Sequence, residues 1–395
     1  MASASAAVKL AAGLSPRTLR AMTDPQSMAA QAGPGPCNDL GDVAGLTVGH
    51  AEDAQARTGV TVVLPDGRAA AAVDVRGGGP GTRETDLLGA DAGMSAIDAL
   101  VLSGGSVFGL EAAGGVVAWL AAAGRGFPVV GRRVPIVPAA IIFDLVNGGD
   151  KSWAEPGSQA QGPYHRLGRE AVAAAEAALR SGLRQPFGLG NRGAGYGARA
   201  GWLKGGIGSA SLVTADGLAV AALVVANPVG SVVRPGSMEF WARPYELQDE
   251  FGGHDAPLRP TPAIDLPGES RIGGGDLMGA NTTIGVVATN LDLDKAALRR
   301  VAMMAHDGFA RAIRPVHTPF DGDTLFALAT GRQGRSHWPD AAQDWLLARC
   351  GTLAADCVAR AVARGVFEAE SLGEALGYRA VLAGQAPGGQ LGDGE

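Results

Sequence analysis

Short apolar runs and amphipathic stretches alternate along the 395 residues of this chain, and their periods predict its elements. Runs rich in valine, threonine and alanine, bounded by turn residues, predict strands at 44–49, 58–64, 69–76, 97–102, 134–145, 206–213, 218–226, 282–290 and 323–330. Apolar residues at helical spacing predict helices at 107–123, 164–182, 294–313 and 340–364. Strands come in runs and long helices flank them, which favours a layered α/β sandwich with the sheets inside.

Composition supports a compact domain with a large core. Hydrophobic residues make up 46% of the chain and charged residues 18%, and many of the 61 glycines lie beside apolar runs, as tight turns require. The first residues have no firm period, so we expect a loose tail at 1–37, one domain at 38–365, and a partly flexible extension at 366–395. The irregular stretch 229–278 predicts a long surface excursion within that domain.

Charge and cysteine content exclude several functional classes. The net charge is −6 without a basic stripe, which argues against nucleic acid and anionic membranes as partners. No apolar stretch reaches the roughly 18 residues that span a bilayer. Cys37, Cys350 and Cys357 match no zinc spacing, and their odd number argues against a disulfide framework, so we expect a cytoplasmic protein.

The stretch GANTTIGVVATN, residues 279–290, contains a bond suited to self-cleavage. A threonine hydroxyl is a weak nucleophile, but a threonine at a chain start can use its own α-amino group as the base, with a pKa of about 7.7–8.0. Cleavage between Asn281 and Thr282 would create such a residue, and the flexible glycines before the bond would ease the geometry. Threonines are also common at strand starts, so this dipeptide alone leaves both interpretations open.

Several motifs in order resemble a known enzyme family. They are VDVRGGGPGTRETDLL, LSGGSVFGLEAAGGVVAWL, IVPAAIIFDL, VANPVGSVV, NTTIGVVATN and AMMAHDGFARAIRPVHTPFDGDTLFALATG. Together they resemble the DmpA-type self-processing N-terminal-nucleophile hydrolases, over roughly residues 38–365, and are most similar to the nylon-oligomer (6-aminohexanoate oligomer) endohydrolases. The resemblance implies a four-layer αββα sandwich, of the kind that the ornithine acetyltransferases also share. It further implies cleavage between 281 and 282 into two associated chains.

By position in these motifs, the resemblance assigns Thr282 as the nucleophile and Asn281 as the residue released from it. Asn227, in VANPVG, matches a position whose amide helps to form the oxyanion hole, where a neutral donor stabilises a developing alkoxide. Asp321 and Asp323 match two aspartates of the nylon-oligomer hydrolases, where the aminopeptidases carry a serine and a glutamate. One carboxylate would hold the Thr282 ammonium or accept its proton, and the other would orient the network. Asp-Gly-Asp is by itself also typical of a turn.

Four further residues complete the expected site. Lys204 is assigned as its cation, because a nearby ammonium lowers the pKa of attacking groups and stabilises negative charge. Ser103 and Ser106 lie in the glycine-rich segment that lines the substrate cleft in the family, so we expect them to contact substrate. Phe143 stands where the nylon-oligomer hydrolases have a tyrosine, and it keeps the packing of that side chain without its hydrogen bond.

The histidines of the site segment are expected to have other roles. His306 is predicted to have a helix-facing role and His317 a loop role, because no serine in a G-x-S-x-G elbow accompanies them. The segment SGGSVFG has glycines like those of a phosphate-binding loop but lacks the Gly-Lys-Ser/Thr ending, which argues against a nucleotide.

The function expected from the sequence is a self-processing amidohydrolase without metal or cofactor. It would cleave linear amides, such as nylon-type oligomers or short peptides, through a threonyl acyl-enzyme. The alternatives are a β-aminopeptidase or D-/L-aminopeptidase of the DmpA type, an acyltransferase of the ornithine acetyltransferase type, and a binding or scaffold protein without chemistry. The resemblance to this family predicts a homodimer or homotetramer.

Overall fold

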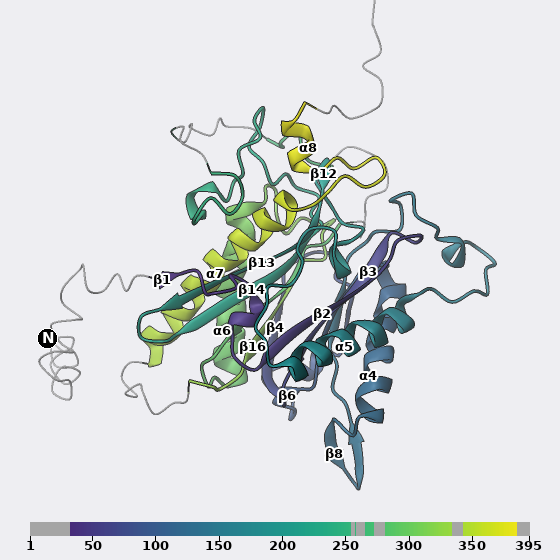
Figure 1. Ribbon diagram of the computed structural model, residues 1–395, viewed down its shortest axis with the longest axis vertical. Coiled ribbons are helices and arrows are strands. Elements are labelled where there is room, and N and C mark those ends of the chain that lie inside the picture. The colour runs from purple at the N-terminus through teal and green to yellow at the C-terminus, as the bar shows by residue number, and fades with distance from the viewer. Residues whose placement is uncertain (1–31, 254–256, 258–264, 272–280, 334–342, 385–395) are drawn as a thin grey trace, which may run out of the picture.

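The computed structural model describes residues 32–253, 257, 265–271, 281–333 and 343–384 (Figure 1). Two β-sheets lie face to face in the middle of the molecule. The larger has seven strands in the order β1 (Ala32–Gly33), β13 (Gly206–Thr214), β14 (Ala219–Ala226), β15 (Ile284–Thr289), β16 (Thr324–Ala329), β4 (Ala69–Val75) and β6 (Ala96–Ile97). β15 and β16 are parallel, and the other neighbours are antiparallel.

The second sheet has five strands. Their order is β2 (Leu46–Asp53), β3 (Thr58–Pro65), β7 (Leu100–Ser103), β10 (Ala139–Ile141) and β5 (Thr82–Arg83), with β7 and β10 parallel. Two short hairpins lie outside both sheets, namely β8 (Phe127–Val129) with β9 (Arg132–Val134), and β11 (Arg199–Ala200) with β12 (Leu203–Lys204). Short 3-10 helices span Leu40–Asp42, Asp86–Leu88, Ser106–Leu110, Ser152–Ala154, Gly193–Gly195 and Arg243–Tyr245.

Helices cover the outer face of each sheet. Helices α4 (Glu111–Ala122) and α5 (Tyr164–Ser181) pack on the five-stranded sheet, whereas α6 (Lys295–Ala312) and α7 (Gln343–Phe367) pack on the seven-stranded sheet. The short helix α8 (Tyr378–Leu382) follows α7. Helix α6 begins where the side chain of Asp294 accepts a hydrogen bond from the Ala297 N–H, and such a cap satisfies a free donor of the first turn.

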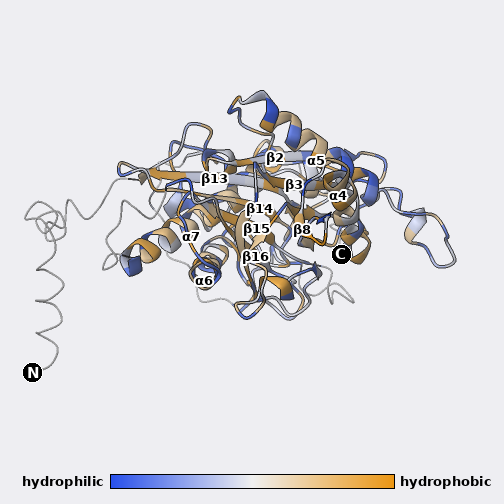
Figure 2. Ribbon diagram, turned by 90° about the horizontal axis from the view of Figure 1, so that it is seen from below, coloured by the Kyte–Doolittle hydropathy of each residue, from blue (hydrophilic) through white to orange (hydrophobic). Residues whose placement is uncertain are grey.

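Alternation along the strands explains the four layers. On β14, Leu223 and Val225 belong to the cluster between the sheets, while Ala222 and Val224 belong to the cluster beneath α6 and α7. Successive side chains of a strand point to opposite faces, so a strand that is apolar throughout is buried on both sides. A third cluster joins the five-stranded sheet to α4 and α5. Figure 2 shows the apolar strands between the helices, and the αββα sandwich predicted from the sequence is confirmed.

Two predicted strands differ from the structure. The stretch 134–145 was expected to be one strand, but β10 covers only Ala139–Ile141, because Pro135 and Pro138 interrupt pairing before it. The run 97–102 divides between β6 and β7, and buried Asp98 lies at the break, where its carboxylate accepts the Ile136 N–H at 2.9 Å. Helix α7 continues three residues beyond its predicted end at 364, and predicted positions 340–342 lie outside the described residues.

The described parts of both terminal segments contact the domain. β1 pairs with β13 at the sheet edge, and the Gly35 N–H donates to Ser211 Oγ at 3.0 Å. At the other end, the ring of Tyr378 stacks on Phe240 with their centroids 4.4 Å apart. The Leu376 carbonyl accepts a hydrogen bond from the Lys204 N–H at 2.8 Å, so this segment touches a predicted site residue.

Candidate active site

The parallel pairing of β15 and β16 brings the two predicted catalytic segments together. Ile284 lies opposite Thr324, and the residues before each strand continue the pairing as a parallel bridge between Asn281 and Asp321. Parallel strands start at the same edge of a sheet, so the Asn-Thr bond and the Asp-Gly-Asp turn lie side by side although 40 residues separate them.

The bond between Asn281 and Thr282 is buried and closely surrounded by hydrogen-bonding groups. Both residues are at most 1% exposed. The Thr282 hydroxyl donates to the carbonyl oxygen of Asn281, and the Gly322 N–H donates to the same oxygen at 3.0 Å. The Thr282 N–H donates to the main-chain oxygen of Asn227, also at 3.0 Å. The carbonyl that would be attacked thus carries a backbone donor, and the nucleophilic hydroxyl lies beside it.

The carboxylate of Asp321, next to this bond, accepts hydrogen bonds from its surroundings. Its Oδ1 accepts the Val229 N–H at 3.1 Å, and its Oδ2 accepts both the N–H and the hydroxyl of Thr318, at 3.1 and 2.6 Å. Burial raises the pKa of Asp321 above its ordinary value, and the charge of Asp323 raises it further. A carboxyl with a raised pKa next to a second carboxylate is a typical arrangement of catalytic acids and bases.

Asp323 connects the threonine segment to a histidine. Its Oδ1 accepts the Thr283 N–H at 2.7 Å, and its Oδ2 accepts the N–H of His317 at 3.1 Å and lies 2.8 Å from Nδ1 of that ring. His317 is in a loop, as predicted, with φ +55°. The contact of His317 with Asp323 was not predicted, since only the order HTPFDGD, with five residues between the two, could have indicated it.

His306 is buried on α6 and packs against His317 with their ring centroids 4.9 Å apart. Its Nε2 lies 3.0 Å from the Asp74 carbonyl oxygen. Burial lowers the pKa of His306 to about 4, so the ring is neutral at physiological pH.

Asn227 adjoins Thr282, but through its main chain. Its side-chain Oδ1 accepts the Arg199 N–H at 2.9 Å, and its Nδ2 donates to the Phe143 carbonyl oxygen at 3.3 Å. One of the two N–H groups on Nδ2 is thereby used, and the other is available to an oxyanion. The contact also gives Phe143 a place at the site edge through its backbone.

Arg271 is a site residue that sequence reasoning missed. Its Nη2 donates to the carbonyl oxygens of Arg199, Asn227 and Pro228 at 3.2, 3.1 and 2.9 Å. Burial, together with the charge of Arg199, lowers the pKa of Arg271 to about 9, although the charge of Asp321 opposes that shift. A single arginine in an irregular glycine-rich stretch carries no period or motif, so only the folded chain reveals that it fixes the loop holding Asn227.

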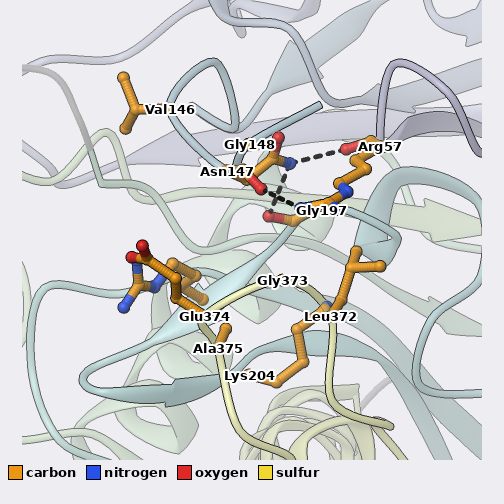
Figure 3. A pocket seen from close by; sticks show the side chains of 11 residues that line it. Arg57, Val146, Asn147, Gly148, Gly197, Lys204, Leu372, Gly373, Glu374 and Ala375 are labelled. Atoms are coloured by element: carbon orange, nitrogen blue, oxygen red, sulfur yellow. Dashed lines mark hydrogen bonds between the residues drawn. The ribbon is translucent and has the colours of Figure 1, made fainter. Parts of the chain in front are cut away.

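Lys204 is 1% exposed and lines a pocket of about 370 Å³ beside the Asn227 loop (Figure 3). Its Nζ donates to the carbonyl oxygens of Gly195 and Gly205, at 3.2 and 2.6 Å. Burial lowers the pKa of Lys204 to about 7, although the charge of Asp144 opposes that shift. Within the described residues, the Lys204 ammonium has no hydrogen bond to Thr282.

The predicted substrate-contacting serines flank the turn after β7: Ser103 is the last residue of the strand, and Ser106 is the first residue of the following 3-10 helix. Ser103 is fully buried and donates to the Gly104 carbonyl oxygen at 3.0 Å, and the Ser106 N–H donates to the Ile142 carbonyl oxygen at 2.9 Å. The same turn binds Asp144, whose Oδ1 accepts the Gly105 N–H at 2.8 Å. Neither serine has a hydrogen bond to the threonine segment within the described residues.

The described ranges contain no group of three or more histidine, cysteine, aspartate and glutamate side chains that could hold a metal ion. None of the helices in that part of the chain combines the length and the apolar character that crossing a bilayer requires.

Comparison with known proteins identifies the family. Residues 38–379 match the family model described as Peptidase family S58. The chain belongs to peptidase family S58. It is thus a hydrolase of the peptidase and amidase type, and the DmpA-type family indicated by the sequence motifs is confirmed. Because the match is to a peptidase family, the acyltransferase alternative is not favoured.

Relatives of this S58 protein include aminopeptidases and nylon-oligomer hydrolases. An uncharacterized aminopeptidase of Mycobacterium leprae (strain TN) is 43% identical over 350 residues, covering 85% of this chain and 92% of the relative. A 6-aminohexanoate-oligomer endohydrolase of Kocuria sp. (strain KY2) is 31% identical over 305 residues, covering 73% and 74%.

Solved structures confirm the fold. The L-aminopeptidase D-Ala-esterase/amidase of Ochrobactrum anthropi, described as a variant of the Ntn hydrolase fold, matches with a TM-score of 0.60 and 20% identity, covering 89% of this chain and 94% of that one. A Burkholderia sp. beta-aminopeptidase matches with a TM-score of 0.58 and 22% identity, covering 91% and 97%.

Proposed function

We propose that this S58 protein cleaves its own Asn281–Thr282 bond and then hydrolyses linear amides with Thr282 as an N-terminal nucleophile. The observation that carries the proposal is the contact of the Thr282 hydroxyl with the Asn281 carbonyl, which also accepts the Gly322 N–H. A nucleophile beside a carbonyl that already has a backbone donor supports attack at that bond, because the donor stabilises the oxyanion as it forms.

In the processing step, Thr282 Oγ adds to the carbonyl carbon of Asn281, and the amide C–N bond breaks. The hydroxyl proton moves to the departing nitrogen, which leaves an ester between the Asn281 acyl group and Thr282 Oγ. Water then hydrolyses the ester to give the Asn281 carboxylate and a free threonine. The side-chain amide of Asn281 is buried without a hydrogen-bond partner. Since buried polar groups are normally paired, this supports a residue that moves away from the site after cleavage.

In the hydrolytic cycle, the freed α-amine of Thr282 takes the proton of its own hydroxyl while the hydroxyl attacks the substrate carbonyl. The amine has an acceptor nearby in the Asn227 carbonyl oxygen, which binds the Thr282 N–H in the intact chain. The free N–H of the Asn227 side chain would donate to the oxyanion. The proton passes to the leaving amine, and water hydrolyses the threonyl ester. In this proposal Asp321 and Asp323 hold the threonine segment in place, and their carboxylates balance the charge of the Thr282 ammonium.

Linear oligoamides are the substrates we propose, supported by the Asp-Gly-Asp pair and by the similarity to 6-aminohexanoate-oligomer endohydrolases. A second candidate is an aminopeptidase acting on short peptides, favoured by the higher identity, 43%, to a relative named as an aminopeptidase. Hydrolysis rates on a linear 6-aminohexanoate oligomer, a β-alanyl amide and an α-aminoacyl amide separate the candidates. A homodimer or homotetramer and a cytoplasmic location stay predictions, and the three free cysteines agree with a reducing compartment.

Mass spectrometry of the purified protein tests the proposal directly. We expect two fragments, the smaller spanning 282–395, and a single full-length chain for Thr282→Ala, which should also lose amide hydrolysis. Thr283→Val is the matched control, because the Thr283 hydroxyl is buried without a partner and its N–H contact with Asp323 remains. An active wild-type preparation that stays one chain would refute the mechanism, and an inactive intact chain would support a scaffold.

A further inference from the structure

The pocket beside Lys204 collects positive charge. Its walls include Arg57, Arg199 and Lys204, and the only acidic residue among its described lining is Glu374, which is exposed (Figure 3). Its volume of about 370 Å³ lies within the roughly 300–1,000 Å³ of small-molecule sites. Three cations against one solvated carboxylate make the cavity a site for an anion, and an organic cation would be repelled there.

The two guanidinium groups have donors to spare. Arg199 forms no ion pair with any described residue, and its Nε is buried without a hydrogen-bond partner. Arg57 uses one nitrogen on the Asn147 carbonyl oxygen, at 2.9 Å. A buried donor without a partner is costly, and a planar guanidinium matches a carboxylate with two parallel hydrogen bonds. The free donors therefore point to a carboxylate as the missing partner.

The nearest buried carboxylate, Asp144, forms no ion pair with Arg57 or Arg199. Asp144 lies behind Gly197, within 2.5 Å of the place where a Cβ would stand. Its Oδ2 accepts the Thr58 hydroxyl at 2.6 Å, its Oδ1 accepts the Gly105 N–H, and Lys151 lies 4.0 Å from it. Asp144 thus favours the charged form of Lys204 but is hydrogen-bonded to Thr58 and Gly105, so the arginines keep their capacity for a ligand.

Asn227 links this pocket to the proposed nucleophile, Thr282, through two hydrogen bonds. The Arg199 N–H donates to Asn227 Oδ1 at 2.9 Å, and the Asn227 carbonyl accepts the Thr282 N–H at 3.0 Å. A short chain whose amide lies at Thr282 could therefore extend past Asn227 and place its end between the arginines. The C-terminal segment closes the opposite wall with Leu372, Gly373 and Ala375.

We propose that this pocket binds the terminal carboxylate of a linear amide substrate, on the part that leaves as the amine. The inference rests on the proposed function, because it names which end of the substrate the site recognises. It predicts a preference for short oligoamides with a free carboxyl end over the same chains ended by an amide.

Equilibrium titration of the purified protein with 6-aminohexanoate and with 6-aminohexanamide tests the pocket, and mass spectrometry of the recovered probes checks that the primary amide stays intact during the titration. We expect the acid to bind about tenfold more tightly than the amide, as charge-assisted hydrogen bonds require. Arg199→Gln and Arg57→Gln should each remove most of that preference. Glu374→Gln is the matched control, because it removes a negative charge instead of a positive one. It should strengthen binding of the acid about twofold.

Equal binding of the two probes, or a preference that both arginine variants keep, would overturn the proposal. The KM values for a linear 6-aminohexanoate oligomer and for its C-terminal amide provide the second readout, and the ratio should follow the binding preference. Charge-selective binding without any amide hydrolysis would refute the proposed function and leave the carboxylate pocket standing. Hydrolysis of both substrates with the same KM would refute the pocket alone.

Discussion

Gly322 combines two requirements at one position, since its N–H serves the Asn281 carbonyl and its missing side chain leaves room for Thr282. A Cβ at this residue would stand 2.5 Å from the Gly79 carbonyl oxygen and 2.8 Å from Thr282 Oγ. Neither neighbour can retreat easily, because the Gly79 N–H is bonded to the Asp321 carbonyl at 2.8 Å and Thr282 is buried. Glycine here is therefore part of the geometry on which the proposed processing depends.

Gly322→Ala should slow self-cleavage by about 100-fold, comparable to the loss of one oxyanion donor, because the added methyl group moves the donor and the hydroxyl apart. A time course of full-length chain and fragments on a denaturing gel measures the rate. Gly67→Ala is the control, since a Cβ there meets nothing within 4 Å. Equal processing rates for the two variants would contradict the role given to Gly322.

Lys204 should make stability depend on pH in a specific window. Burial lowers its pKa from 10.5 to about 7 in the folded chain. Between these two pKa values the unfolded chain binds more protons than the folded chain. The free energy of unfolding therefore increases as the pH is raised from about 7 to 10.5, and this gain is lost when the pH returns to about 7. The slope is at most about 1.4 kcal/mol per pH unit.

The measurement compares wild type with Lys204→Met in urea at several pH values between 7 and 10. The difference in free energy of unfolding, wild type minus variant, should increase with pH. Curves that run parallel across this window would show that the ammonium is not desolvated in the folded protein.

The family resemblance assigned candidate site residues that lie in contiguous motifs, and it did not indicate residues that reach the site only through folding. Thr282, Asp321 and Asp323 were assigned because NTTIGVVATN and FDGDT match motifs of the family, and the structure places them side by side. Arg271 and His317 act through contacts that no local pattern records. The amide of Asn227 was predicted as a donor to the oxyanion, whereas its hydrogen bonds to Phe143 and Arg199 follow only from the fold.

Elements with strong periods could be predicted nearly to the residue, and weakly patterned ones could not. Helix α5 was expected at 164–182 and spans Tyr164–Ser181, because its apolar residues recur at helical spacing and Gly182, at φ +63°, ends it. The run 134–145 was apolar throughout, which does not distinguish strand from buried loop. The two-residue strands β5 and β6 carry too few positions for any pattern.

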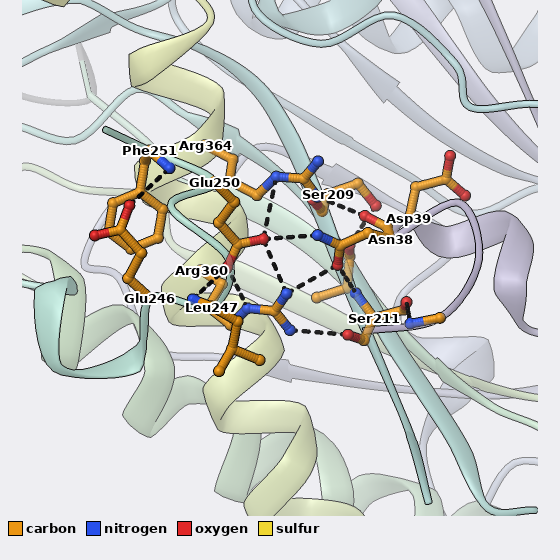
Figure 4. A network of polar contacts seen from close by, with 12 residues as sticks. Asn38, Asp39, Ser209, Ser211, Glu246, Leu247, Glu250, Phe251, Arg360 and Arg364 are labelled. Carbon is orange, nitrogen blue, oxygen red and sulfur yellow. Dashed lines mark hydrogen bonds and ion pairs between the residues drawn. The ribbon is translucent and has the colours of Figure 1, made fainter. Parts of the chain in front are cut away.

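Helix α7 anchors distant segments of the chain through one buried ion pair. Arg360, 1% exposed, binds Glu250 with two hydrogen bonds of 2.5 and 2.9 Å (Figure 4). The same guanidinium donates to the Ser211 carbonyl oxygen at 2.8 Å and to Asn38 Oδ1 at 2.9 Å. The irregular stretch around residue 250, β13 and the N-terminal segment thus meet at a single side chain.

Glu250→Gln should destabilise the fold by about 3–5 kcal/mol, because it leaves the Arg360 charge buried without its counter-charge. Urea unfolding followed by circular dichroism measures the change. Arg180→Ala removes a pair to Glu176 in which the arginine side chain is 75% exposed, and it should cost no more than about 0.5 kcal/mol. A Glu250→Gln variant as stable as that control would mean that water or other groups satisfy Arg360.

At the scale of the whole molecule, the catalytic segments and the pocket are assembled from parts that the sequence keeps far apart. The order of strands in the seven-stranded sheet places β15 between β14 and β16, so that residues 227, 282 and 321 converge. Hydrophobic periods predict that such strands exist and that both faces are buried, but they do not specify their neighbours. Family resemblance supplied the layers, and only the structure gives the register.

The stretch expected to be a C-terminal extension contacts the proposed substrate pocket and not the Asn281–Thr282 bond, so it bears differently on substrate binding and on self-cleavage. The Leu376 carbonyl holds the Lys204 N–H, and Leu372 and Ala375 line the cationic pocket. The groups around the Asn281–Thr282 bond come instead from Asn227 and from residues 321–323. Self-cleavage should therefore tolerate the loss of this stretch better than substrate binding does.

A chain that ends at Glu370 should still process at Thr282 but should lose at least about tenfold in kcat/KM on a carboxylate-ended oligoamide, because it lacks a pocket wall and the support of Lys204. Fragment masses and steady-state rates measure the two activities on one preparation. Tyr378→Phe is the control: it removes only the 2.6 Å hydrogen bond to the Met238 carbonyl, costs about 1 kcal/mol of stability, and leaves the pocket intact. If the shortened chain kept full activity, residues 372–376 would have no part in binding substrate, and a failure to process would mean that these residues also support the Thr282 site.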